Sequence, residues 1–136
     1  MRILALDVGD RRIGVAVSDP TGLLARPLTI ISRKGSAGDI QFVNRLVKEQ
    51  EAGKLIIGLP LSLDGSVGPQ AAKVKEFTEK LAPSLPIPFE FRDERFSTSA
   101  VKEQRAEMGA KKKKRRAPDD AEAAAVILQG YLDENR

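Results

Sequence analysis

The 136-residue chain contains neither cysteine nor histidine. Without cysteine there are no disulfides, thiolate nucleophiles or cysteine-ligated zinc sites. Without histidine, Ser-His-Asp and Cys-His catalysis and histidine-ligated zinc are excluded as well. An enzyme with this sequence has to work with carboxylates, lysine, arginine and hydroxyl groups. A bound metal would have oxygen ligands, which favours Mg²⁺ or Mn²⁺.

Aromatic residues and long apolar runs are also scarce. Five phenylalanines, one tyrosine and no tryptophan are too few for a strip of base-stacking rings, which argues against a module that reads single strands by stacking. The longest apolar stretches, such as residues 123–128, fall far short of the roughly 20 residues that span a bilayer. Asp7 interrupts the first apolar stretch too early for a signal peptide. We therefore expect a cytoplasmic protein that does not associate with membranes.

The length fits a single domain spanning residues 1–136, and the 41% hydrophobic content is enough for a buried core. The net charge of +4 is unevenly distributed, because six of the 23 basic residues form the run 111–116. The other 17 basic residues and the 19 acidic residues leave the rest of the chain at −2. The run is either a solvated loop or an arm that binds phosphates, and charge alone does not separate the two.

Apolar runs separated by turn residues predict an α/β domain. Strands are expected at 2–8, 13–18, 28–32, 54–59 and 89–92, with one turn at 9–10 and another bracketed by Pro20 and Pro27. Helical spacing indicates a helix containing residues 40–47, with Asp39 near its start where an acid suits the helix dipole. Further helices are expected from Pro69 with Ala72 among its apolar positions, over 97–108, and after Pro118. This order favours a mixed sheet covered by helices on both faces.

Three acids stand out by their positions. Asp7 ends the first strand, Glu94 follows the strand at 89–92, and Asp120 lies in the first turn of the last helix. Each has an ordinary explanation as a turn residue, a solvated strand end or a helix cap. If the first strand is central, however, the three meet at one edge of the sheet. Close carboxylates repel each other unless cations neutralise them, and Mg²⁺ or Mn²⁺ held there can activate water for in-line attack on phosphorus.

Four segments resemble the motifs of the YqgF family, also called RuvX, whose members are named as Holliday junction resolvases or pre-16S ribosomal RNA nucleases. They are DVGDRRIGVAVSD (7–19), GLPLSLDGSVGPQA (58–71), RDERFST (92–98) and DDAEAAAVIL (119–128). The resemblance implies a ribonuclease H-like fold with a five-stranded mixed sheet flanked by helices. It also implies that Asp7, Glu94 and Asp120 are the catalytic residues and the ligands of Mg²⁺ or Mn²⁺, with two ions by the logic of two-metal sites. Asp93 could share the metal, and Asp119 could take the place of Asp120.

Basic and hydroxyl residues near these motifs are the candidate nucleic-acid contacts. They are Arg11, Arg12, Arg95, Thr98, Lys111, Lys112, Lys113, Lys114, Arg115 and Arg116. Arginines on the turn after Asp7 can hold a phosphate close to the proposed metal site. Ser97 either contacts a phosphate or caps the helix that it begins. Gly58 and Gly65 are expected to serve backbone geometry more than chemistry.

The sequence thus predicts a divalent-metal-dependent nuclease, and the resemblance favours a role in 5′-end processing of the 16S rRNA precursor during ribosome biogenesis. Two alternatives remain: a Holliday junction resolvase, and a non-catalytic factor that binds RNA or the ribosome. The expected partners are nucleic acid, with RNA favoured over branched DNA, and ribosomal precursor particles. The chain could act as a monomer or as a homodimer. An actin-like ATPase is disfavoured, since such proteins close two duplicated domains over the nucleotide.

Overall fold

The computed structural model describes residues 1–94 and 119–135. The strands are β1 (Arg2–Val8), β2 (Arg12–Ser18), β3 (Ala25–Ser32), β4 (Ala52–Leu59) and β5 (Phe89–Asp93). The α-helices are α1 (Ser36–Glu49), α2 (Pro69–Leu81) and α4 (Asp120–Glu134), and a short 3₁₀ turn, η1 (Ala82–Ser84), follows α2. All five strands expected from the sequence are confirmed. The helix expected over 97–108 lies outside the described residues.

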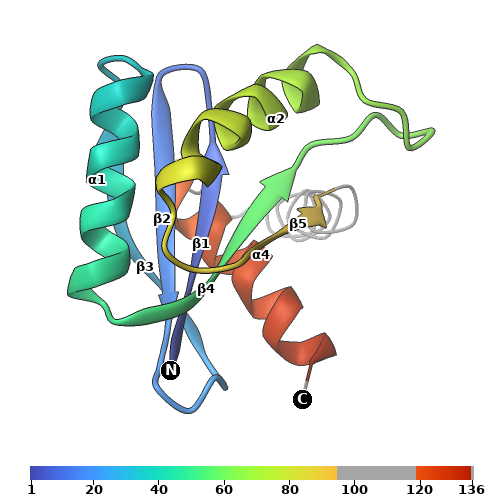
Figure 1. The fold of residues 1–136 in the computed structure, drawn as a ribbon. Helices are drawn as coiled ribbons and strands as arrows, with labels where there is room; N and C mark the ends of the chain where they lie inside the picture. Colours follow the sequence, from blue (N-terminus) through green and yellow to red (C-terminus); the bar gives the residue numbers. More distant parts are fainter. Residues whose placement is uncertain (95–118, 136) are drawn as a thin grey trace, which may run out of the picture.

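The strands form one mixed sheet in the order β3-β2-β1-β4-β5 (Figure 1). The first strand is central, as the convergence of the acids required. It pairs antiparallel with β2, placing Asp7 opposite Gly14, and parallel with β4. Because β4 also pairs parallel with β5, the carboxyl ends of β1, β4 and β5 lie at the same edge of the sheet.

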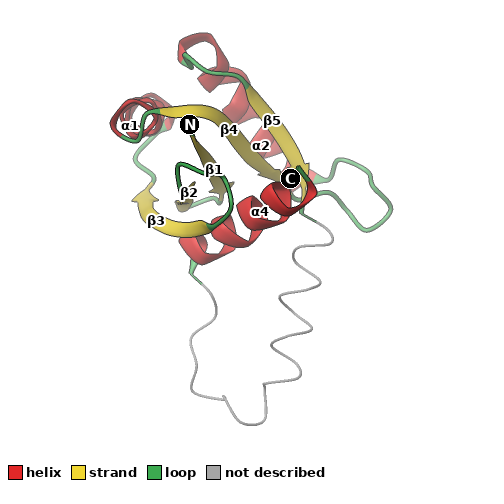
Figure 2. Cartoon of the chain, turned by 90° about the horizontal axis from the view of Figure 1, so that it is seen from below, coloured by secondary structure: helices red, strands yellow, loops and turns green. Residues whose placement is uncertain are grey.

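Helices cover both faces of the sheet (Figures 1 and 2). On one face α1 and α2 pack against alternate residues of the strands, including Leu4, Leu6 and Val8 of β1. On the other face α4 is the helix, among the described residues, that packs against Ala5, Ala16 and Ile56. No helix among the described residues is both long enough and apolar enough to cross a membrane.

Two local expectations are wrong. Pro27 does not close a turn but lies inside β3, which extends back to Ala25. The strand tolerates proline because β3 is at the edge of the sheet, and its pairing with β2 is irregular beside Pro27. Ala72 of α2 is exposed, and the buried alanine at the start of that helix is Ala71.

Candidate active site

Asp7 faces α4 because side chains alternate along β1. Leu4, Leu6 and Val8 point to the face that carries α1 and α2, whereas Ile3 and Ala5 pack on the face that carries α4. The period of two therefore places the side chain of Asp7 on the α4 face, at the carboxyl end of the strand. Asp7 is half-buried at this position.

Glu94 extends from β5 to the same face. Its backbone N–H donates to the carbonyl of Leu59 at 3.0 Å, which continues the β4–β5 pairing by one residue. Its side chain is buried, with the residue only 8% exposed. Gly58 leaves the room for it, since a Cβ at position 58 would lie 2.6 Å from Glu94 Oε1 and 2.7 Å from Ile127 Cδ1. Gly58 thus contributes by lacking a side chain, which leaves room for the side chain of Glu94.

Asp120 is the first residue of α4. The N-cap of this helix is Asp119, whose Oδ1 accepts a hydrogen bond from the N–H of Glu122 at 2.8 Å. The ordinary helix-cap explanation therefore holds for Asp119. The start of α4 packs tightly on β2 at Gly14, where a Cβ would overlap the backbone carbonyl of Asp120. Since Gly14 pairs with Asp7, this contact brings Asp120 beside the central strand.

The three carboxylates influence each other. The carboxyl groups of Asp7 and Glu94 interact directly, and this interaction favours a proton on Glu94 by raising its pKa and lowering that of Asp7. Burial, followed by the charge of Asp7, raises the pKa of Glu94 to about 8. Burial also raises the pKa of Asp7 above its ordinary value, and the negative charge of Asp120 adds to that rise. One proton between two carboxyl groups is the expected response when no cation balances them.

Asp120 has a cation of its own. The Nε of Arg12, at the start of β2, lies 3.0 Å from Asp120 Oδ2. Within residues 1–94 and 119–135, no three acidic side chains are gathered as closely as the ligands of one metal ion. The structure thus joins Asp7 to Glu94 directly and places Asp120 next to them, turned toward Arg12.

The other predicted site residues are placed as follows. Arg11 and Arg12 are exposed where the β1–β2 turn leads into β2. The alternation along β5 places Asp93 on the face opposite Glu94, although its charge still raises the pKa of Glu94. The remaining candidates lie outside the described residues: Arg95, Ser97, Thr98, Lys111, Lys112, Lys113, Lys114, Arg115 and Arg116.

Sequence reasoning missed three residues around the site. Gly14 had no assigned role, because its importance comes from a helix that lies far along the chain. Arg33 and Asp39 form a buried pair behind the β1–β2 turn, with Arg33 Nε 3.1 Å from Asp39 Oδ2. Asp39 was expected to be a helix-start acid, and it does lie in the first turn of α1, but it is also almost completely buried. No local signal links it to Arg33.

Comparisons with known proteins agree with this architecture. A family model described as "RuvX: Holliday junction resolvase" matches residues 1–134. A Roseiflexus protein (strain RS-1) named "Putative pre-16S rRNA nuclease" is 43% identical over 135 residues, covering 99% of this chain and 96% of its own. A protein of the same name from Dehalococcoides mccartyi is 50% identical over 127 residues, covering 93% and 94%.

Two solved structures share the fold at low sequence identity. One is "T. thermophilus RuvC in complex with Holliday junction substrate", with a TM-score of 0.62, 17% identity, and coverage of 99% of this chain and 96% of that one. The other is a fowlpox virus resolvase in complex with Holliday junction DNA, with a TM-score of 0.59, 16% identity and 99% coverage of both chains. The fold is ribonuclease H-like, which confirms the fold class expected from the sequence.

Proposed function

This chain belongs to the RuvX family of nucleases, hydrolases that act on phosphodiester bonds, and we propose that Asp7, Glu94 and Asp120 form its active site. One observation carries the proposal. Asp7 of the central strand and Glu94, which directly follows β5, bring their carboxyl groups together at the edge of the sheet where α4 begins with Asp120. A purely structural role does not account for a buried carboxyl group, Glu94, in contact with the half-buried Asp7, since burial of these charges opposes folding unless they are neutralised.

The chemistry of these residues fits a hard divalent cation. Carboxylate oxygens are the preferred protein ligands of Mg²⁺ and Mn²⁺. Burial and the charge of Asp7 raise the pKa of Glu94, and the carboxylate of Asp120 attracts the guanidinium of Arg12, so the electrostatics of all three acids favour a nearby positive charge. We propose that Asp7, Glu94 and Asp120 ligate Mg²⁺ or Mn²⁺, with two ions bound. The metal would supply an activated water and stabilise charge on the phosphate.

The chain's own residues position the proposed metal ligands and bind the substrate. Asp7 and Glu94 are held rigidly by the β1–β4–β5 ladder, whereas Asp120 comes with the docking of α4 on Gly14. Arg12 and Arg11 lie exposed beside Asp7 and bind the phosphates of the nucleic-acid backbone. Arg12 can exchange its contact with Asp120 for a phosphate when the acids are neutralised. Arg95, Thr98 and the run Lys111–Arg116 extend this backbone contact, which carries no sequence information.

RNA is the favoured substrate. The relatives that match almost the whole chain are named as pre-16S rRNA nucleases. We propose 5′-end processing of the 16S rRNA precursor, with ribosomal precursor particles as partners in the cytoplasm and residues 1–136 acting as one domain. A single copy is enough to trim RNA, whereas paired cuts in a Holliday junction would favour a two-fold dimer.

A cleavage assay with four substrates tests the proposal. Single-stranded RNA, duplex RNA, single-stranded DNA and a synthetic four-way junction are each incubated with Mn²⁺ and wild type, Asp7→Asn or Asp133→Asn. Asp133 is exposed at the far end of α4, so its variant is a matched control for the loss of one carboxylate. We expect RNA cleavage by wild type and Asp133→Asn, and a loss of about 10³-fold or more in Asp7→Asn.

Three other results would change the conclusion. Cleavage that Asp7→Asn does not diminish would contradict the assigned site. Junction cleavage without RNA cleavage would favour the resolvase alternative. Salt-sensitive RNA binding without turnover in any divalent metal would leave the non-catalytic binding factor.

A further inference from the structure

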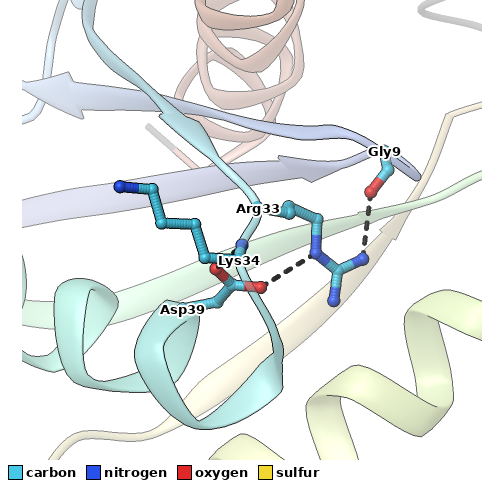
Figure 3. Close-up of polar contacts among 4 residues, drawn as sticks. All are labelled: Gly9, Arg33, Lys34 and Asp39. Carbon is cyan, nitrogen blue, oxygen red and sulfur yellow. Dashed lines mark hydrogen bonds and ion pairs between the residues drawn. The ribbon is translucent and has the colours of Figure 1, made fainter.

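One residue outside the β1–β2 hairpin, Arg33, bonds to the backbone of the turn between these strands, and the proposed reaction does not use it. The turn closes on itself through the N–H of Gly9, which donates to the Arg12 carbonyl at 2.8 Å. Two further carbonyls of the turn both accept from Arg33. The backbone N–H of Arg33 donates to the Arg11 carbonyl at 2.9 Å, and Arg33 Nη1 donates to the Gly9 carbonyl at 3.0 Å (Figure 3).

Arg33 is itself fixed in place by Asp39. The Nε of Arg33 lies 3.1 Å from Asp39 Oδ2, and Asp39 Oδ1 accepts the backbone N–H of Lys34 at 3.2 Å (Figure 3). The Asp39 side chain is 2% exposed and that of Arg33 20% exposed. The Arg33 guanidinium also lies over the ring of Phe77 in α2, 5.1 Å from its centroid. The buried Asp39 carboxylate and the ring of Phe77 thus hold the half-buried Arg33 guanidinium in one geometry.

A second contact to the turn is much weaker. Lys73 Nζ, from the first part of α2, lies 3.2 Å from Asp10 Oδ1, but both side chains are more than half exposed. Solvent and salt screen such a pair, and exposed pairs of this kind hold geometry poorly. The side chain of Arg12 also pairs with Asp120 of α4. Arg33 differs from both, because its guanidinium restrains the backbone of the turn itself, at the carbonyl of Gly9.

The turn and the acids are held by different means. Asp7 lies in the central strand, between β2 and β4, and Glu94 is attached to β4. Neither needs Arg33 to stay in place. Arg11 and Arg12 lie at the turn itself, and the pairing of Arg12 with Ser32 is the sheet contact that reaches them from β3. Loss of the Arg33 side chain thus loosens the turn that carries the two arginines and leaves Asp7 and Glu94 where they are.

We propose that Arg33 and Asp39 are positioning residues that hold the β1–β2 turn so that Arg11 and Arg12 meet the phosphate backbone of the substrate. The proposal rests on the proposed function, since it assigns the two arginines to substrate binding. It separates substrate binding, which depends on the pair, from the carboxylate chemistry, which does not. A pair that served stability alone would show no such separation.

The test uses the double variant Arg33→Met/Asp39→Asn. It removes both buried charges together, so that no carboxylate is left buried without a partner, and the new amide oxygen at position 39 can still accept from the N–H of Lys34. Melting temperature and circular dichroism establish that the variant is folded. The matched control is Arg45→Met, because Arg45 also lies over a ring, that of Phe42 at 4.7 Å, and pairs with Glu49 far from the turn.

Binding and turnover are then measured separately. We expect the double variant to raise KM for cleavage, and Kd for a labelled RNA measured in EDTA, by about tenfold, with kcat within about twofold of wild type. The dependence of rate on Mn²⁺ should not change. The slope of log K against log salt should become shallower by up to about 1.4, the value for two phosphate contacts on a single strand. Arg45→Met should match wild type in all of these measurements.

The same double substitution in a protein that already lacks Arg11 and Arg12 shows whether Arg33 and Asp39 act through the turn. In Arg11→Ala/Arg12→Ala the same double substitution should change Kd by less than about twofold, because the groups that it positions are gone. A full tenfold loss there, a loss confined to kcat, or an unchanged Kd in the first background would each overturn the proposal. The Kd measurement does not need turnover, so a wild type that binds RNA without cleaving it would refute the proposed function and still test the pair.

Discussion

Two carboxyl groups in contact, the half-buried Asp7 and the buried Glu94, cannot both be charged at little cost unless positive charge lies beside them. This makes the stability of the metal-free protein depend on pH. In the folded protein the pKa of Glu94 is about 8, against an ordinary value of 4.5. Between these pH values the folded state keeps a proton that the unfolded state has released, so stability falls as pH rises through that window.

Replacement of Glu94 by glutamine removes this pH dependence. In EDTA, wild type should lose up to about 5 kcal/mol of unfolding free energy between pH 4.5 and about 8 relative to Glu94→Gln, since each unit of pKa shift is worth about 1.4 kcal/mol. Chemical denaturation at several pH values measures the difference. Mn²⁺ should raise the melting temperature of wild type at the upper end of this range and leave the variant unchanged. Parallel pH profiles for the two proteins would refute the role of Glu94.

At the scale of secondary-structure elements, the site depends on how closely α4 approaches the sheet. At Gly14 of β2 a Cβ would overlap the backbone carbonyl of Asp120, and backbone cannot move aside as the end of a side chain can. The start of α4 would have to move away from β2. The carboxylate of Asp120 and the apolar packing of Ala124 on Ala16 would both be disturbed.

Gly14→Ala should therefore destabilise the protein by about 3 kcal/mol and abolish most cleavage activity. The matched control is Gly38→Ala, because Gly38 lies within α1 with open space around its Cα and should gain about 0.5–1 kcal/mol on substitution. Denaturant unfolding and the Mn²⁺ cleavage assay measure both effects. A stable and active Gly14→Ala would show that α4 does not have to dock so closely.

At the scale of the whole molecule, the positive charge is concentrated in one segment of the sequence, the basic run Lys111–Arg116. Replacing Lys111–Arg116 with six glutamines changes the net charge from +4 to −2. If the run contacts the nucleic-acid backbone, the salt dependence of RNA binding should become shallower by up to about 4 units of slope, and affinity at low salt should fall by several orders of magnitude. Fluorescence anisotropy across a salt series measures both.

The turnover number provides the control for that variant. At saturating RNA, kcat should stay close to that of wild type, because the carboxylates are left intact. An unchanged salt slope would mean that the run is a solvated segment without a role in binding, the alternative that charge alone left open.

The sheet and the neighbourhoods of two of the three acids could be predicted from the sequence because those features are local. The apolar runs of β1 and β4 are continuous, and Asp7 is visible as the charge that ends the first one. A central first strand was the condition for the strand ends to converge at one edge, and the order of the strands meets it. The choice between Asp119 and Asp120 could not be resolved, because capping depends on where the first turn of the helix starts.

Features that depend on distant contacts could not be predicted. The extension of β3 through Pro27 requires knowing that the strand is at an edge. The role of Gly14 requires knowing that a helix far along the chain crosses it. Arg33 and Asp39 are separated by only six positions, yet their common partner is the turn at Gly9. Spacing along the chain does not show which backbone carbonyl a side chain will reach.

The assembly of the site from β1 and α4 has a consequence for the order of events during synthesis. Asp7 leaves the ribosome long before Asp120, with Glu94 between them. Until α4 docks, the face that carries Ala5, Ala16 and Ile56 lacks the helix that covers it in the folded protein. A nascent chain whose α4 has not yet emerged from the ribosome therefore has only two of the three proposed catalytic residues, Asp7 and Glu94. Under the proposed assignment, cleavage has to wait until Asp120 and α4 have left the ribosome, so the chain lacks a complete site while that segment is still being made next to the RNAs of the ribosome.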